Sequence, residues 1–287
     1  MTNSNHSRYP KSSQDGLNQL NKLNLNALLQ ISLEAGREIL AVYAKDFDVE
    51  YKEDESPLTQ ADQRAHQVIT KGLAKITPAI PVLSEEGKPL SYQERKEWER
   101  FWLVDPLDGT KEFVKKNGEF TVNIALIEGE YPIAGVIYAP VLDVFYFGIV
   151  GKAAYKLEEA SKAAITDEQT LLEHSVPLPD QDGTGKIRVV ASRSHRSEET
   201  TAYIRTLEAK HGTVEVVSAG SSLKFCLVAE GKADYYPRHA PTMEWDTGAG
   251  QAIVEAAGGK VVRTKDQKRL SYNQEQLLNS WFVASRS

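Results

Sequence analysis

The spacing of apolar residues predicts two long helices near the start of the chain. Over residues 23–43, and again over residues 59–75, apolar side chains recur every three or four positions. This period gathers them on one face of a helix, where they can pack against a core. A shorter, polar helix is expected at residues 92–96.

Short apolar runs rich in β-branched and aromatic residues predict a set of strands in the middle of the chain. Turn residues such as Gly129 and Pro140 separate these runs. The expected strands are residues 82–84, 102–104, 122–128, 133–139 and 144–150. Because little helical pattern lies between the later runs, we expect them to form an antiparallel sheet.

The second half of the chain alternates between the two patterns. Strands are expected at 186–191, 214–217 and 233–236, and helices at 198–210, 222–230 and 247–257. Such alternation is typical of an α/β lobe. Residues 151–185 are polar and weakly patterned, and we interpret them as the junction between two lobes plus an edge segment.

The length of the chain agrees with a division into two lobes. At 287 residues it is near the size at which a single core divides, so one large or two coupled domains are expected. We expect a short disordered tail at residues 1–16, an N-terminal α+β lobe at 17–160 and a C-terminal α/β lobe at 161–287.

Composition narrows the class of protein. Hydrophobic residues make up 41% of the chain and charged residues 26%, the balance of an ordinary globular protein. The net charge of −6 argues against nucleic acid or an anionic membrane surface as a partner. The single Cys226 excludes an internal disulfide and, within an apolar run, is expected to be a buried thiol.

The same chain lacks the apolar stretches that direct proteins to membranes. No run approaches the roughly 18 apolar residues of a membrane span. Residues 1–16 lack the apolar core of a signal peptide. We therefore expect a cytoplasmic protein with no integral membrane segment, and leave open peripheral association with the inner membrane. It would act as a monomer or a homodimer.

Candidate chemistry is densest where an apolar run ends in Asp105-Pro106-Leu107-Asp108-Gly109-Thr110. Two carboxylates and a glycine turn at the end of a strand suit both a divalent cation and a phosphate. Mg²⁺ takes oxygen ligands, commonly one or two carboxylates together with phosphate oxygens. Glycine lets backbone N–H groups come close to an anion. The segment therefore indicates metal-assisted phosphoryl transfer.

Three further acidic residues lie at the ends of expected elements. Glu85 follows a strand, Asp62 lies in the opening turn of a helix, and Asp246 precedes another helix. Each has an ordinary structural alternative, because aspartate favours helix N-caps and first turns for its own hydrogen bonds and charge. The sequence alone leaves those alternatives open.

The motifs in combination resemble those of the inositol monophosphatase family. Residues 105–110 and the stretch Trp245-Asp246-Thr247-Gly248-Ala249-Gly250 resemble its paired signatures, and Glu85 and Asp62 match its other acidic elements in order. The resemblance covers the chain from about residue 25 to its end. Within that family, residues 102–113, 117–126, 192–195 and 220–231 are most similar to the branch that acts on adenosine 3′,5′-bisphosphate.

That resemblance implies a fold and an activity. The fold would be α/β (α+β), a two-lobed αβαβα sandwich of alternating helix and sheet layers with the active site between the lobes. The activity would be Mg²⁺-dependent hydrolysis of the 3′-phosphate of adenosine 3′,5′-bisphosphate to AMP and phosphate in sulfur assimilation. The sulfated relative, 3′-phosphoadenylyl sulfate, is a further expected substrate, and Li⁺ an expected inhibitor.

The resemblance also assigns roles to residues around two to three Mg²⁺ ions. It implies Glu85, Asp105 and the carbonyl of Leu107 as ligands of the first ion. It implies Asp105, Asp108 and Asp246 for the second, and Glu85 with waters for the third. Asp62, Thr110 and Glu85 would act in catalysis, with Thr110 hydrogen-bonded to Asp62 and orienting the attacking water.

Substrate contacts would come from both lobes. The expected contacts are Asp108, Gly109, Thr110, Ser221, Ser222, Lys224, Arg238 and Asp246. The turn before the helix at residue 223 would offer N–H groups to an anion. Lys224 would pair with the 5′-phosphate, and Arg238 would add a second cation or stack on adenine. The alternative for both residues is a solvated surface cation.

Three alternatives for the whole protein remain at this point. An inositol monophosphatase or a fructose 1,6-bisphosphatase would use the same metal chemistry on another substrate. A non-catalytic nucleotide or metal sensor would keep the pocket without turnover. The loop residues His195, Lys111 and Glu112 are candidates for lining the substrate pocket, with solvent exposure as the equal alternative.

Overall fold

The computed structural model describes residues 23–44, 50–51, 57–58, 60–180, 185–191 and 197–286. The expected tail at residues 1–16 lies outside these ranges, as does the stretch 192–195 with His195. The helices are α2 (Leu25–Tyr43), α3 (Gln60–Ile76), α4 (Tyr92–Arg95), α5 (Thr110–Val114), α6 (Glu168–His174), α7 (Glu198–His211), α8 (Leu223–Ala229), the 3-10 helix η1 (Glu244–Asp246) and α9 (Gly248–Ala256). The strands are β1 (Glu50–Tyr51), β2 (Pro57–Leu58), β3 (Val82–Ser84), β4 (Arg100–Asp108), β5 (Thr121–Glu128), β6 (Tyr131–Ala139), β7 (Val144–Ile149), β8 (Ala153–Glu158), β9 (Val176–Leu178), β10 (Ile187–Ala191), β11 (Val214–Ser218), β12 (Tyr235–Arg238), β13 (Lys260–Arg263) and β14 (Phe282–Ser285).

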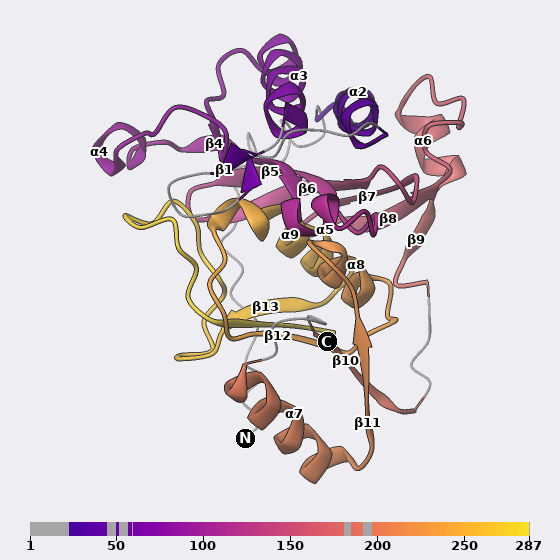
Figure 1. Ribbon diagram of the computed structural model, residues 1–287, viewed down its shortest axis with the longest axis vertical. Helices are drawn as coiled ribbons and strands as arrows, with labels where there is room; N and C mark the ends of the chain where they lie inside the picture. Colours follow the sequence, from indigo (N-terminus) through magenta and orange to yellow (C-terminus); the bar gives the residue numbers. More distant parts are fainter. Residues whose placement is uncertain are drawn as a thin grey trace, which may run out of the picture.

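These elements stack in five layers (Figure 1). Helices α2, α3 and α6 lie on one side of a seven-stranded sheet, and α8 and α9 lie between that sheet and a five-stranded sheet. Helix α7 covers the far side of the five-stranded sheet. The expected αβαβα sandwich is therefore confirmed.

The two sheets differ in the direction of their strands. The larger sheet has the order β3-β4-β5-β6-β7-β8-β9, with β3 parallel to β4 and every later pair antiparallel. The smaller sheet has the order β11-β10-β12-β14-β13, in which β10 runs parallel to β11 and β12. The parallel pairs follow from helical crossovers, which antiparallel hairpins do not need.

Helix α9 can lie between the sheets because its sequence, Gly-Ala-Gly-Gln-Ala-Ile-Val-Glu-Ala, is rich in small residues. A Cβ added at Gly250 would lie 2.4 Å from the Phe225 ring, and one added at Gly135 of β6 would lie 2.7 Å from the Ala249 carbonyl oxygen. The backbone of α9 therefore touches both neighbours directly. This packing places η1, which precedes α9, at the ends of the central strands.

Most expected elements are present, and one segment contains more regular structure than expected. The helical patterns at 23–43 and 59–75 form α2 and α3, and the apolar runs form β3 to β7. Residues 151–185, expected as a junction with an edge segment, contain β9 at the edge of the seven-stranded sheet and, in addition, β8 and α6. Their pattern is weak because β8 buries a charged residue, Lys156, where a strand pattern calls for an apolar one.

The division between the sheets falls later in the chain than the expected lobe boundary. Strand β9 pairs with β8 in the seven-stranded sheet, and the five-stranded sheet begins with β10 at Ile187. The boundary expected between residues 160 and 161 precedes both α6 and β9. The short helix α5 and the strands β13 and β14 were not expected at all.

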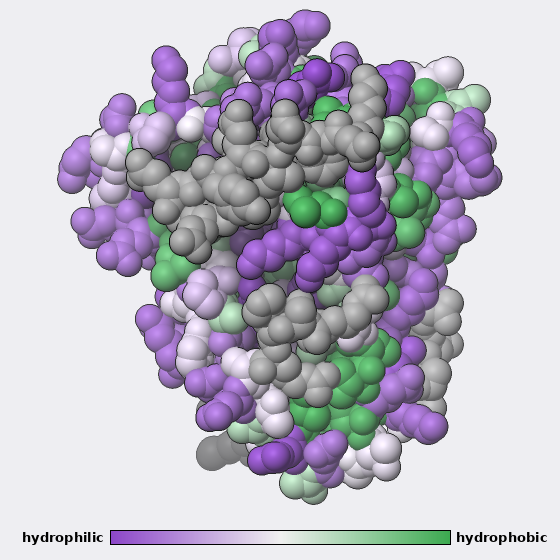
Figure 2. All heavy atoms as spheres, in the orientation of Figure 1, coloured by the Kyte–Doolittle hydropathy of each residue, from purple (hydrophilic) through white to green (hydrophobic). Residues whose placement is uncertain are grey.

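The visible surface of the described residues is mainly hydrophilic. In the orientation of Figure 1, hydrophobic residues form a few separate patches between larger hydrophilic areas (Figure 2). None of the helices in the described part of the chain combines the length and apolarity that crossing a membrane requires.

Candidate active site

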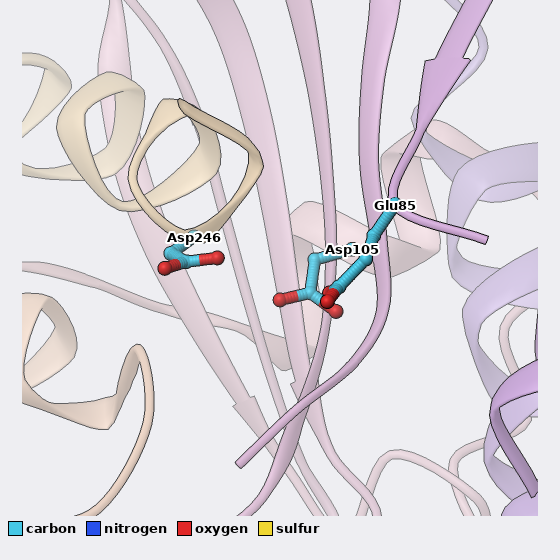
Figure 3. Close-up of side chains that lie close together, drawn as sticks. All are labelled: Glu85, Asp105 and Asp246. Atoms are coloured by element: carbon cyan, nitrogen blue, oxygen red, sulfur yellow. The ribbon is translucent and has the colours of Figure 1, made fainter. Parts of the chain in front are cut away.

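Three carboxylates from distant parts of the chain meet at the ends of the central strands. Glu85 follows β3, Asp105 lies in β4, and Asp246 ends η1. One oxygen of each lies within 4.8 Å of the other two. Figure 3 shows the carboxylates of Glu85 and Asp105 close together, with Asp246 approaching from the opposite side. The parallel pairing of β3 with β4 explains why Glu85 lies beside Asp105, since the Glu85 N–H donates to the carbonyl of Val104 at 3.2 Å.

A bulge in β4 directs Asp105 and Asp108 to the same face of the sheet. In a regular strand, residues three positions apart point to opposite faces. Here Asp105 pairs with Asn123 and Asp108 pairs with Thr121, so β4 contains one more residue than β5 over this stretch. An extra residue of this kind shifts the later side chains to the other face. The Leu107 N–H stabilises the bulge by donating to Asp105 Oδ1 at 3.0 Å.

The electrostatics of this cluster favour a bound cation. Burial raises the pKa of Asp105 well above its usual value, and the nearby charges of Glu85, Asp108, Asp246 and Asp62 raise it further. The pKa of Asp246 is raised in the same way, by burial and then by Asp108. Because like charges held together in a buried place repel, a cation would stabilise the group. The donors are all carboxylate oxygens, which fit Mg²⁺.

Asp108 lies beside this cluster and is held by the other lobe. It is not one of the three carboxylates that converge within 4.8 Å. Its Oδ2 accepts a hydrogen bond from the Ser222 hydroxyl at 2.8 Å, and the Asn123 amide lies 3.4 Å from the same oxygen. Ser222 precedes α8, so this contact joins the two lobes.

Asp62 and Thr110 lie on elements that border the cluster. Asp62 is buried in the first turn of α3 and is close enough to Asp105 to raise its pKa. Thr110 is the first residue of α5, which follows the left-handed Gly109 at φ 95°. The hydrogen bond expected between Asp62 and Thr110 stays a prediction, as does a metal contact from the Leu107 carbonyl.

The glycine turn meets the second lobe directly. A Cβ added at Gly109 would lie 3.2 Å from Ser221 Cβ. The backbone of Ser221 has a φ of 41°, a conformation that residues other than glycine rarely adopt. Such strain is kept where the surrounding structure requires it, and it is concentrated at functional sites.

A cavity of about 310 Å³ opens from these residues toward the second lobe. Its lining includes the expected substrate contacts Asp108, Gly109, Ser221, Ser222, Lys224, Arg238 and Asp246. Lys111 and Glu112, whose role the sequence left open, line it too, together with Lys115. The structure thus brings most expected site residues of both lobes to one cavity, while Glu85, Asp105 and Asp62 lie in or near the adjoining acidic cluster.

Two cations in this cavity are unusual. Lys224 is buried, its Nζ is 3.4 Å from the Ala219 carbonyl, and it forms no ion pair with any residue that the structure describes. Burial lowers the pKa of Lys224 to about 8. Arg238 donates from Nη2 to the Pro241 carbonyl at 2.9 Å, while its buried Nε has no hydrogen-bond partner within the described ranges. The alternative of a solvated surface cation is therefore wrong for Lys224.

Sequence reasoning passed over Asn123 and Thr121. Both are polar residues at alternate positions of an otherwise apolar strand, β5, directly opposite the two aspartates. That alternation is a signal in the sequence, but it acquires meaning only once the register with β4 is known. Cys226 is buried, as expected.

The fold and its acidic cluster define a class of metal-dependent phosphatases, and comparison with known proteins agrees. Residues 22–285 match the inositol monophosphatase family, and the chain belongs to it. The sequence is 48% identical over 261 residues to the 3′(2′),5′-bisphosphate nucleotidase CysQ of Salmonella typhimurium strain LT2, covering 90% of this chain and 98% of that protein. It is 47% identical over 264 residues to CysQ of Escherichia coli strain K12, covering 91% and 99%.

A solved structure extends the similarity to three dimensions. The crystal structure of CysQ from Bacteroides thetaiotaomicron, described as a bacterial member of the inositol monophosphatase family, superposes with a TM-score of 0.83 at 48% identity. The match covers 92% of this chain and 98% of that one.

Proposed function

We propose that this protein is a Mg²⁺-dependent 3′(2′),5′-bisphosphate nucleotidase that converts adenosine 3′,5′-bisphosphate to AMP and phosphate. The carrying observation is that one cavity joins an acidic cluster to two cations, the buried Lys224 and the half-buried Arg238, neither of which forms an ion pair with a residue that the structure describes. The acidic cluster suits a metal-bound phosphate, and the two cations suit another anionic group on the same substrate. Near-complete coverage of relatives named as bisphosphate nucleotidases supports that substrate class.

The residues present fit a site for two to three Mg²⁺ ions. Glu85, Asp105, Asp108, Asp246 and the carbonyl of Leu107 would supply the protein ligands. When bound, Mg²⁺ supplies positive charge to the phosphate oxygens and acidifies a coordinated water. No protein nucleophile is needed, because phosphoryl transfer depends mainly on positioning and on charge stabilisation.

The chain's own groups would orient the reaction. Backbone N–H groups at Gly109 and Thr110 would bind the 3′-phosphate. Thr110 and Asp62 would hold the attacking water and accept its proton as its oxygen bonds to phosphorus. The bond between phosphorus and the 3′-oxygen then breaks, and that oxygen takes a proton from water to give AMP.

Lys224 and Arg238 would bind the 5′-phosphate. A buried ammonium without a carboxylate partner is costly unless an anion joins it. Arg238 adds a planar donor group with one nitrogen still unsatisfied. The same subsite would hold the sulfated phosphate of 3′-phosphoadenylyl sulfate, which makes that nucleotide a second substrate. Both cations fit the second phosphate of a bisphosphate better than they fit a neutral polyol.

The test is Mg²⁺-dependent phosphate release from adenosine 3′,5′-bisphosphate, with inositol 1-phosphate and fructose 1,6-bisphosphate in parallel. We expect rapid release from the nucleotide alone, abolished in Asp108→Asn. Release mainly from a sugar phosphate would overturn the nucleotide assignment and keep the metal site. Binding of Mg²⁺ and nucleotide without release would instead support a sensor.

The setting of the enzyme follows from the same proposal. We infer a cytoplasmic protein of sulfur assimilation that acts as a monomer or a homodimer and is inhibited by Li⁺ competing at a cation site. The buried Cys226 and the net charge of −6 support this setting. Light scattering, cell fractionation that includes the inner membrane, and Li⁺ titration of phosphate release test these three points.

A further inference from the structure

Asn123 occupies an unusual place for a polar side chain. It lies in the middle of the larger sheet, on β5, with 1% of its surface exposed. Its neighbour two positions earlier, Thr121, is completely buried on the same face. The bulge in β4 sets Asn123 opposite Asp105 and Thr121 opposite Asp108. Two buried polar side chains therefore lie beside the two aspartates, on the neighbouring strand of the same sheet.

Hydrogen bonds fix the orientation of the Asn123 amide. The Thr121 hydroxyl donates to Asn123 Oδ1 at 3.0 Å, so the amide oxygen faces Thr121. The amide nitrogen then points the other way, to Ser222 Oγ at 2.9 Å and to Asp108 Oδ2 at 3.4 Å. Each polar atom of the side chain has a partner, as a buried amide requires.

The network decides which oxygen of Asp108 remains available. The Ser222 hydroxyl accepts from the Asn123 amide and can donate to Asp108 Oδ2 at 2.8 Å. Both donors therefore converge on Oδ2, which leaves Oδ1 for another ligand. The Asp246 carbonyl lies 2.9 Å from the same hydroxyl, so the turn before α8, β5 and η1 meet at Ser222. The hydroxyl has a single proton, and the charged Asp108 carboxylate is a stronger acceptor for it than the neutral carbonyl.

We propose that Asn123 is a positioning residue, which holds Ser222 against Asp108 so that this carboxylate presents Oδ1 to the metal site. The inference rests on the proposed function, in which Asp108 is a metal ligand. A neutral amide suits this place because it supplies donors without adding charge to a crowded acidic cluster. Groups that hydrogen-bond to metal ligands typically change metal affinity or activity 10–100-fold when removed.

The experiment measures Mg²⁺ binding by calorimetry on the substrate-free protein at one fixed pH. We expect Asn123→Ala to bind Mg²⁺ about 10–100-fold more weakly than the natural protein. Asn123→Leu is a second variant in case the smaller alanine impairs folding. It keeps a side chain of similar size in the apolar strand, and we expect the same loss of Mg²⁺ affinity. The concentration of Mg²⁺ that gives half-maximal phosphate release should rise in parallel.

A matched control separates positioning from general stability. Asn273 is another buried asparagine, whose amide bonds to Arg95 at 2.8 and 2.9 Å, and its φ of 61° is accessible to glycine. Asn273→Gly should lower the melting temperature and leave Mg²⁺ affinity within about twofold of the natural value. In a double-mutant cycle, Asn123→Ala should add little to the loss caused by Ser222→Ala, because both act through one hydrogen-bonded path.

The outcomes distinguish this inference from the function on which it rests. If the natural protein binds Mg²⁺ and both Asn123 variants bind it within about twofold, the inference is overturned and the proposed function stands. Fully additive losses in the double variant would overturn the shared path through Ser222. A natural protein that binds no Mg²⁺ at millimolar concentration would overturn the proposed metal site itself, and this inference with it.

Discussion

Two buried lysines, Lys156 and Lys224, show how differently this protein treats the same side chain. Lys156 has carboxylates of Glu158, Asp180 and Glu230 at 3.0, 3.2 and 3.3 Å. Lys224 has no ion pair with any residue of the described ranges. Burial works against the charge in both cases, yet the three acids raise the pKa of Lys156, whereas the pKa of Lys224 falls to about 8.

In the proposed function, this difference separates a structural charge from one that binds substrate. Glu230, at the end of α8, also accepts a hydrogen bond from the Tyr146 hydroxyl at 2.8 Å, so Lys156 and its partners tie α8 to β7 and β8. Lys224, at the start of the same helix, lines the cavity without a direct ion pair among the described residues, and the more distant charges of Asp108, Glu112 and Glu119 offset its burial only in part. A buried charge that the fold leaves unpaired marks a site where a ligand completes it.

The acidic cluster, like Lys224, gathers buried charge, but its charge is negative. A substitution in this cluster should have the largest effect on activity. Asp105→Asn should reduce phosphate release by at least about 10²–10³-fold, the loss typical of removing one electrostatic contact to a reacting group. Without Mg²⁺, the variant should be at least as stable to urea as the natural protein, because it removes one buried repelling charge. Reduced stability without metal would contradict the repulsion argued for this cluster.

Removing the charge of Lys156, which is paired, should lower the stability of the protein and leave its catalytic activity unchanged. We expect Lys156→Met to lower the free energy of unfolding by about 3 kcal/mol, because the buried Glu230 and the half-buried Asp180 would keep their charges with less compensation. Urea denaturation measures the change. The KM of the Lys156→Met variant for the nucleotide at 20 °C should stay near the natural value. A large rise in KM would mean that Lys156 and its acidic partners also shape the substrate cavity.

Removing the charge of Lys224 should have the opposite effects, a gain in stability and a loss of substrate binding. Lys224→Met deletes a buried charge that has no partner, so the substrate-free protein should gain about 1–3 kcal/mol of stability. Loss of the charged contact should weaken binding of the bisphosphate by about 1.5–3 kcal/mol, seen as a higher KM. A less stable variant with unchanged KM would show that Lys224 is a structural cation.

The smallest expected effect is a pH dependence that follows from the pKa of Lys224, about 8 in the folded protein. Unfolded lysine has a pKa near 10.4, so between about pH 8 and 10.4 the unfolded chain binds the extra proton. Stability from this group therefore rises with pH across that window. Nucleotide affinity falls over the same range as the ammonium loses its proton.

Measuring KM and urea stability at pH 7.5 and 9.5 tests both signs together. KM for the bisphosphate should rise by up to about tenfold in the natural protein and stay nearly flat in Lys224→Met. A KM that is equally pH-dependent in the two proteins would assign the titration to another group.

The candidate active-site motifs could be recognised in the sequence because they are local. Asp105, Asp108, Gly109 and Asp246 stand in short stretches whose residue types carry their own chemistry. Helix and strand patterns were equally readable in α2, α3 and β4 to β7. Each of the two helices buries one apolar face, and each strand is buried on both faces, so that it forms a nearly continuous apolar run. The pattern failed in β8, where the buried Lys156 is compensated by the exposed Glu158 of the same strand and by two acids distant in sequence, Asp180 and Glu230.

The amino-acid sequence by itself determined most of the elements, the order of the acidic motifs and the family. Only the tertiary structure decided which charges are compensated. Asp180 and Glu230 lie 24 and 74 positions from Lys156. Asp180 reaches it because it follows β9, the strand paired with β8, and Glu230 reaches it from the end of α8. The role of Asn123 likewise depends on the bulge in β4, because a shift of one residue in register would turn its side chain away from Asp108. Burial and pairing are properties of contacts between distant segments, and no local pattern encodes them.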